Sequence, residues 1–165
     1  MSAPTPTIVV VGAGRVGTYL ACKLARAGGR VLLKGTAPAK DRPASRKDGF
    51  VDALCAEAGV TFIREYDQCR GQAVDFVFVS VKTYSLPAVK AELDAHGLKP
   101  RIAILVHNGI VKPVFPTSVR VVIPQSYDFH ETPGVGCGVA IHVKNEDKPW
   151  VGFGGYCPPR HRPAL

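Results

Sequence analysis

The stretch that decides the fold is TIVVVGAGRVGTYLACKLARAGGRVLLK, residues 7–34. It begins with an apolar, β-branched run at 7–11, passes through G-x-G-x-x-G at 12–17 and continues with apolar residues at helical spacing. The glycine pair at 28–29 ends the helical pattern, and a second apolar run follows at 30–34. A strand, a glycine turn, a helix and a strand in this order make up half of a dinucleotide-binding unit.

The three glycines of the turn have different physical roles. Gly12 allows a tight turn out of the strand, Gly14 lets a pyrophosphate approach the backbone, and Gly17 lets the helix pack closely on the first strand. The helix start also offers N–H groups and a partial positive charge to phosphates. The alternative is a glycine turn that only packs. We predict that the whole turn binds a dinucleotide through Gly12, Ala13, Gly14, Arg15, Val16 and Gly17.

The end of the second predicted strand indicates which dinucleotide binds. An NAD site usually has Asp or Glu there, about 20 residues after the motif, to hold the ribose 2′-hydroxyl. This chain has Lys34 at that place, and the nearest acid is Asp41, inside a predicted loop. A lysine suits a 2′-phosphate, so the sequence favours NADP over NAD. The alternative is that Lys34 is a solvated lysine at a strand end.

Length and composition are typical of one globular domain with a core. The chain has 165 residues, of which 46% are hydrophobic and 21% charged. No apolar run approaches the roughly 18 residues that span a bilayer. Residues 1–7 lack the basic region of a signal peptide. We therefore expect a cytoplasmic protein without a membrane partner.

The five cysteines are an odd number, widely spaced and without a C-x-x-C pair. This pattern indicates neither a metal site nor a disulfide framework. We expect reduced thiols, with Cys22 and Cys55 as packing residues of helices.

The net charge of +8 raises the question of nucleic-acid binding. The lysines and arginines are spread along the chain, are densest at 34–47 and do not alternate with aromatic residues. This distribution disfavours a nucleic-acid partner. A basic nucleic-acid-binding protein is kept as an alternative hypothesis.

The rest of the chain predicts an α/β fold of Rossmann type, with a mostly parallel sheet and helices on both faces. After Pro124, a strand at 139–143 and a last strand at 150–153 are expected to form an antiparallel hairpin at the sheet edge. The dinucleotide-binding domain then spans 1–155, and the proline-rich residues 156–165 are predicted to be a disordered tail. The other predicted helices are 50–58 and 86–95, and the other predicted strands are 60–63, 75–81, 101–106 and 119–123.

Three motifs together resemble the N-terminal domain of ketopantoate reductase, which reduces 2-dehydropantoate to pantoate with NADPH in the route to pantothenate and coenzyme A. They are GAGRVG at 12–17, VKTYSL at 81–86 and HNGI at 107–110, and the resemblance covers about residues 7–155. It implies that the glycine turn holds the pyrophosphate and that Lys34 contacts the 2′-phosphate.

The same resemblance gives roles to two further residues. It implies that Lys82 lies near the adenosine end and that Asn108 faces the nicotinamide and the 2-oxo acid substrate. The alternatives are a solvated lysine at a helix start and an N-G turn residue without a ligand.

Members of that family carry a second, helical domain, whose lysine protonates the developing alkoxide and whose glutamate helps to bind substrate. We expect this chain to end before such a domain, so no catalytic residue is assigned. Two hypotheses follow: the cofactor-binding half of an NADPH-dependent reductase, or a non-catalytic NADP-binding module or sensor. In either case an exposed apolar face predicts a homo-oligomer or a helical partner.

Overall fold

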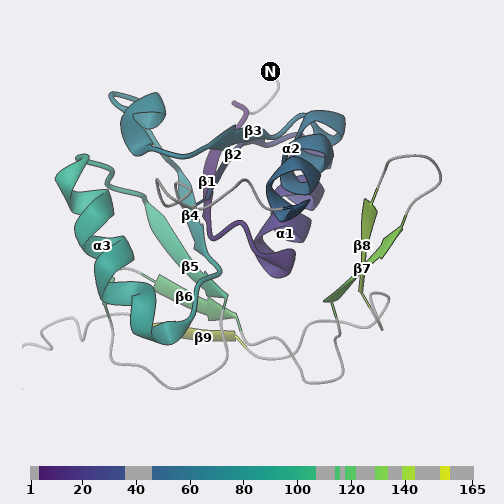
Figure 1. Cartoon of the computed structure of the whole chain (residues 1–165). Coiled ribbons are helices and arrows are strands. Elements are labelled where there is room, and N and C mark those ends of the chain that lie inside the picture. Colours follow the sequence, from purple (N-terminus) through teal and green to yellow (C-terminus); the bar gives the residue numbers. More distant parts are fainter. Residues whose placement is uncertain are drawn as a thin grey trace, which may run out of the picture.

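The computed structural model describes residues 4–35, 46–106, 114–115, 118–121, 129–133, 139–143 and 153–156. Its main sheet has the strand order β3-β2-β1-β4-β5-β6-β9 (Figure 1). The strands of this sheet are β1 (Thr7–Val11), β2 (Arg30–Lys34), β3 (Thr61–Ile63), β4 (Phe76–Val79), β5 (Ile102–Val106), β6 (Ser118–Val121) and β9 (Phe153–Tyr156).

The sheet is parallel from β3 to β6, and only β9 runs antiparallel to its neighbour. The chain builds β1, β2 and β3 outward in one direction, then crosses back to place β4, β5 and β6 on the other side of β1. This is the order of the Rossmann fold, and the strand order reverses between β1 and β4. The predicted fold class is confirmed.

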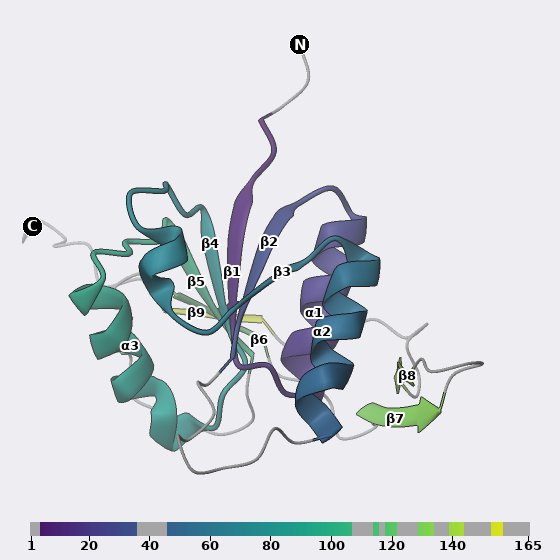
Figure 2. The same cartoon turned by 45° about the horizontal axis from the view of Figure 1, so that its top comes forward.

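Helices cover both faces of the sheet. Helices α1 (Arg15–Arg26) and α2 (Arg46–Ala58) lie on one face, and α3 (Leu86–Ala95) lies on the other (Figure 2). Two short 3-10 helices, η1 (Tyr66–Cys69) and η2 (Thr83–Ser85), lie in the connections on the α3 side. This three-layer arrangement explains why the strands are apolar throughout instead of alternating.

Among the described residues the core forms two clusters, one on each face of the sheet. Successive residues of β1 alternate between them: Ile8 and Val10 belong to the cluster on the α1 and α2 side, and Val9 and Val11 to the cluster on the α3 side. The first cluster also contains Cys22 and Cys55, both free thiols. Their predicted role as packing residues is confirmed.

The predicted C-terminal hairpin at the sheet edge is wrong. The strand at 139–143 does form, as β8 (Val139–Val143), but it pairs with the preceding β7 (Phe129–Pro133) in a separate two-stranded sheet. Figure 1 shows this pair standing apart from the main sheet, next to α1 and α2. The edge is closed instead by β9 alone, which pairs with β6. Edge pairing uses backbone N–H and C=O groups, so the side-chain pattern did not identify the partner.

The predicted tail at 156–165 lies almost entirely outside the described residues. Only its first residue, Tyr156, is described, and it is the last residue of β9. The domain boundary therefore stays a prediction. In the part of the chain that the structure describes, no helix combines the length and apolar character needed to cross a bilayer.

Candidate cofactor-binding site

The turn between β1 and α1 starts with a backbone conformation that favours glycine. Gly12 has φ +106°, in the region that L side chains rarely adopt. Its N–H donates to the carbonyl oxygen of Lys34 at 3.0 Å, which extends the pairing of β1 and β2 by one residue. The predicted role of Gly12 in the tight turn is confirmed.

Gly17 lies where α1 meets the end of β1. A Cβ atom built on Gly17 would be 1.8 Å from the carbonyl oxygen of Gly12 and 2.4 Å from Ser80 Oγ. Both distances are far below any real Cβ contact, so a side chain here would push the start of α1 away from the strand. The predicted packing role of Gly17 is confirmed.

Gly14 has the opposite surroundings. Apart from its two chain neighbours, no described residue has a heavy atom within 4 Å of a Cβ built on Gly14, and the residue is exposed. It is the N-cap of α1, where the described residues provide neither a side-chain cap nor an acid in the first turn. The first hydrogen bond of the helix runs from Thr18 N–H to Gly14 C=O, at 2.9 Å. Open space in front of a helix N-terminus fits an anion such as a pyrophosphate.

The remaining residues of the motif complete this helix start. Ala13 is partly buried against the cluster on the α1 and α2 side, Val16 is half-buried, and Arg15 is exposed. Whether any of them contacts a dinucleotide stays a prediction.

Ser80 is a residue of this site that the sequence did not single out. It directly follows β4, the strand beside β1 where the strand order reverses. Its N–H donates to the carbonyl oxygen of Val11 at 2.9 Å, and its hydroxyl is shared between the carbonyl oxygens of Val11 at 3.1 Å and Gly12 at 3.0 Å. Ser80 therefore holds the backbone of Gly12, the first residue of the glycine turn, from the neighbouring strand β4. The sequence feature that could have identified Ser80 is its polar side chain within the mostly apolar run at 75–81.

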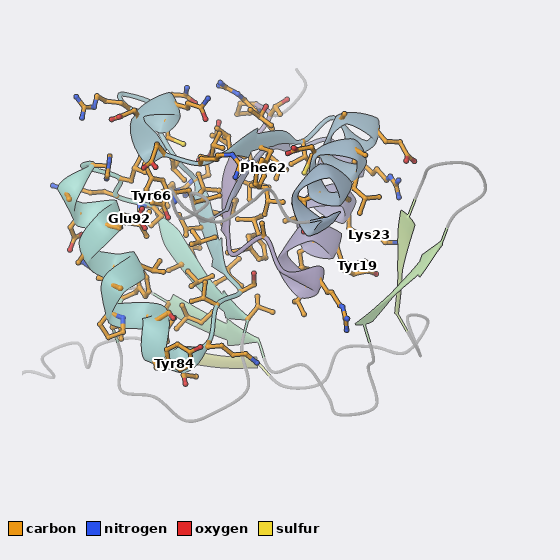
Figure 3. The ribbon with its side chains drawn as sticks, viewed as in Figure 1. Tyr19, Lys23, Phe62, Tyr66, Tyr84 and Glu92 are labelled. Carbon is orange, nitrogen blue, oxygen red and sulfur yellow. The ribbon has the colours of Figure 1, made fainter. Side chains whose placement is uncertain are left out.

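Lys34 is buried at the end of β2, so it is not the solvated strand-end lysine of the alternative interpretation. Only 7% of the residue is exposed. Its ammonium donates to the carbonyl oxygen of Gly35 at 3.0 Å and lies 3.3 Å from Glu92 Oε1 on α3. It also lies over the ring of Tyr66, 5.0 Å from the ring centre. Figure 3 shows Tyr66 and Glu92 close together on the α3 side.

Tyr66 lies beneath the ion pair of Lys34 and Glu92, with its ring facing the lysine ammonium. It is completely buried, and its hydroxyl has no hydrogen-bond partner among the described residues. Burial raises the pKa of the phenol, and the nearby carboxylate of Glu92 raises it further. The ring therefore stays neutral and offers its π-face to the ammonium.

Lys82 lies two residues beyond Ser80, at the carboxyl end of β4. It is exposed and is the N-cap residue of η2, and its carbonyl oxygen accepts a hydrogen bond from Ser85 N–H at 2.9 Å. Tyr84 is 82% exposed in the same connection and projects outward beside the start of α3 (Figure 3). Ligands of such sheets bind beyond the carboxyl ends of the strands, which is where the glycine turn and Lys82 lie. Asn108 lies outside the described residues.

The sequence matches one known protein family over most of its length. Residues 8–114, more than half of the chain, match the family described as ketopantoate reductase PanE/ApbA. No curated protein matches the sequence.

Among solved structures, the chain is similar to a candidate coenzyme-F420-dependent NADP-reductase from Arthrobacter sp. FB24, with 20% identity, coverage of 69% of this chain and 61% of the other, and a TM-score of 0.49. It is also similar to FadB2 from M. tuberculosis, with 18% identity, coverage of 74% and 50%, and a TM-score of 0.48. For lactate dehydrogenase from Eimeria maxima the identity is 16%, the coverage 63% and 37%, and the TM-score 0.44. The chain thus spans less than two thirds of each of these proteins. Such distant likenesses carry no argument about function.

Proposed function

Because the chain belongs to the ketopantoate reductase PanE/ApbA family, in which a nicotinamide dinucleotide is the cofactor, we propose that it binds NADP(H) at the glycine turn. In this proposal it supplies the cofactor-binding half of a reductase for a 2-oxo acid, 2-dehydropantoate. A bound NADPH would supply the hydride for that reduction.

One observation carries the proposal: the glycine turn is tightly packed at Gly17, against β1, and has open space at Gly14, at the start of α1. No room exists for a side chain at Gly17, where α1 rests on Gly12 and Ser80, whereas the space at Gly14 is empty of described atoms. A glycine turn with only a packing role would need the close contact at Gly17 but would not need open space at Gly14. Together they put backbone N–H groups at a helix N-terminus within reach of a pyrophosphate.

The preference for NADP over NAD is proposed from the end of β2. An NAD site would hold the ribose 2′-hydroxyl with a carboxylate there. This chain has Lys34 at that position, and the exposed Lys82 lies at the end of β4 on the opposite side of β1. Two ammonium groups favour a 2′-phosphate over a 2′-hydroxyl.

Catalysis in this proposal depends on a further, helical partner. Asn108 is proposed to orient the nicotinamide or the substrate carbonyl, since an amide both donates and accepts hydrogen bonds. Hydride transfer also needs a group that stabilises the developing oxyanion in a site shielded from water. We propose that a helical domain or partner supplies this group and shields the site from water.

A non-catalytic NADP-binding module is the second candidate function. It is supported by the open space at Gly14 at the start of α1, which a binding module needs, and no described residue of the site is assigned a catalytic role. The proposed reductase needs a helical domain or partner, so the assay that separates the two functions uses NADPH and 2-dehydropantoate with such a domain added to the chain. Turnover is then expected only of a reductase.

Calorimetric titration of the full chain with NADPH and NADH tests the binding site. We expect NADPH to bind more tightly than NADH. The variant Gly14→Val should lose about ten-fold or more in affinity for both, equal to about 1.4 kcal/mol, because its side chain fills the space proposed for the pyrophosphate. The circular dichroism of this variant should be unchanged, since the Cβ of the new side chain meets no described atom beyond its chain neighbours. Equal NADPH binding by wild type and Gly14→Val would place the ligand elsewhere.

A second pair of titrations tests the cofactor preference. Lys34→Ala should reduce the preference for NADPH over NADH, whereas a preference that persists in this variant would remove Lys34 from the 2′-phosphate site.

A further inference from the structure

The ammonium of Lys34 has an ionic partner that does not belong to the glycine turn. Glu92 Oε1 lies 3.3 Å from Lys34 Nζ, and the two side chains are 8% and 38% exposed. The carboxylate comes from α3, on the face of the sheet opposite α1 and α2 (Figure 3). This ion pair therefore links the end of β2 to a helix that contributes no residue to the proposed pyrophosphate site.

Both partners are attached to ordered elements. Lys34 is paired in register with Val11 on one side and Ile63 on the other. Glu92 lies in the last turns of α3, where its carbonyl oxygen is 2.8 Å from His96 Nδ1. Both partners are thus held by a strand or a helix, and the ion pair does not depend on a loop.

One ammonium carries one positive charge, and here that charge already faces a carboxylate. A 2′-phosphate arriving at Lys34 has to share the ammonium with Glu92 or displace it, and in both cases two anions approach each other. NADH has no phosphate at this position, so its binding does not involve this conflict. The repulsion from Glu92 therefore weakens the binding of NADPH and leaves the binding of NADH unaffected.

We propose that Glu92 is a specificity-determining residue, which reduces the discrimination between NADP(H) and NAD(H) by neutralising Lys34. This inference rests on the proposed function, because it assumes that the dinucleotide binds at the glycine turn with its 2′ position near Lys34. It adds that a residue of α3 controls how strongly the phosphate is recognised.

Calorimetric titrations of the full chain with NADPH and NADH test this inference. In Glu92→Gln, the affinity for NADPH should rise about two- to five-fold, the range for a partly exposed ion pair. The affinity for NADH should stay the same. Asp94→Asn is the matched control, because Asp94 lies on the same helix, carries the same charge and pairs with Lys90 instead. It should change neither affinity.

The double variant Lys34→Gln/Glu92→Gln shows whether the effect passes through the ion pair. Compared with Lys34→Gln alone, adding Glu92→Gln should leave NADPH affinity unchanged. An equal gain with and without Lys34, an equal gain in Asp94→Asn, or an unchanged or lower NADPH affinity in Glu92→Gln would each overturn the inference.

The outcomes also separate this inference from the proposed function. A wild-type chain that binds NADPH with an affinity independent of Glu92 overturns only the role of Glu92. A wild-type chain that binds neither dinucleotide overturns both.

Discussion

Replacing Gly17 with alanine is expected to destabilise the fold through a contact at the glycine turn. The new Cβ would lie 1.8 Å from the carbonyl oxygen of Gly12, where real contacts do not fall below 3.0 Å. The start of α1 must therefore move by about 1 Å, and the hydrogen bonds between Ser80 and the turn must adjust with it. Overpacking of this kind costs about 1–3 kcal/mol. The better helix propensity of alanine offsets about 0.5–1 kcal/mol of this cost.

The net loss for Gly17→Ala is then about 1–2 kcal/mol in the free energy of unfolding, measured by urea denaturation with circular dichroism. For a chain of this size the melting temperature should fall by about 2–4 °C per kcal/mol. Gly14→Ala is the matched control, three residues earlier in the same motif, where an added Cβ meets no described atom. Its unfolding free energy should fall by less than about 1 kcal/mol, the cost of alanine in place of glycine at a helix N-cap, and by less than that of Gly17→Ala. Equal stability of Gly17→Ala and wild type, or equal losses in both variants, would show that the close contact at Gly17 does not destabilise the fold.

Three further predictions concern the surroundings of the site. Ser80→Ala removes the hydroxyl that bonds Val11 and Gly12, so the unfolding free energy should fall by about 1 kcal/mol in urea denaturation, and an unchanged value would show that the hydroxyl does not hold the turn. Tyr66→Phe removes a buried hydroxyl without a described partner and keeps the ring under Lys34, so stability should be equal to or greater than that of wild type by up to about 1 kcal/mol; a loss of that size would reveal a hidden partner. Burial raises the pKa of Cys55 from its usual 9.0 to about 12, so the unfolded chain releases this proton first, and the contribution of Cys55 to stability should decline as the pH rises from about 9 towards 12. Cys55→Ala should show a smaller decline across that range, and an identical pH dependence would contradict the prediction.

The sequence predicted those parts of the fold that depend on local pattern. The β1–α1–β2 unit was predictable because glycine spacing, strand run and helical period all lie within residues 7–34. The buried strands β4 and β5 were predictable because a central parallel strand needs apolar residues on both faces. Their order in the sheet follows from the right-handed connections of such units.

The partner of β8 was predicted wrongly because the pairing is made by the backbone. The turn at 145–147 suggested a hairpin with the segment that follows, whereas the structure pairs β8 with the segment that precedes it. Both arrangements satisfy the same weak side-chain alternation. Strand β9 contains the pair Gly154 and Gly155, and such a segment gives no side-chain pattern to fix its partner.

The site was predictable in its backbone and not in its side-chain partners. Gly12 and Gly17 have the roles expected of the motif, because the motif encodes a conformation and a close approach. The sequence also placed a lysine at the end of β2. It could not predict that Glu92, far along the chain on α3, would pair with Lys34, since this contact depends on how a helix packs across the sheet. Ser80 was missed because its hydrogen bonds to Val11 and Gly12 depend on the pairing of β4 with β1, although it stands out as a polar residue in an apolar run.

The proposed function requires that a nicotinamide dinucleotide binds at the N-terminus of α1. Titrating the isotope-labelled chain with NADPH, while recording the resonances of backbone amides, tests this most directly because it locates the ligand. We expect the largest saturable changes at Gly14, Arg15, Val16 and Gly17, with smaller changes at Ser80. An absence of changes, or changes confined to β7 and β8, would contradict it.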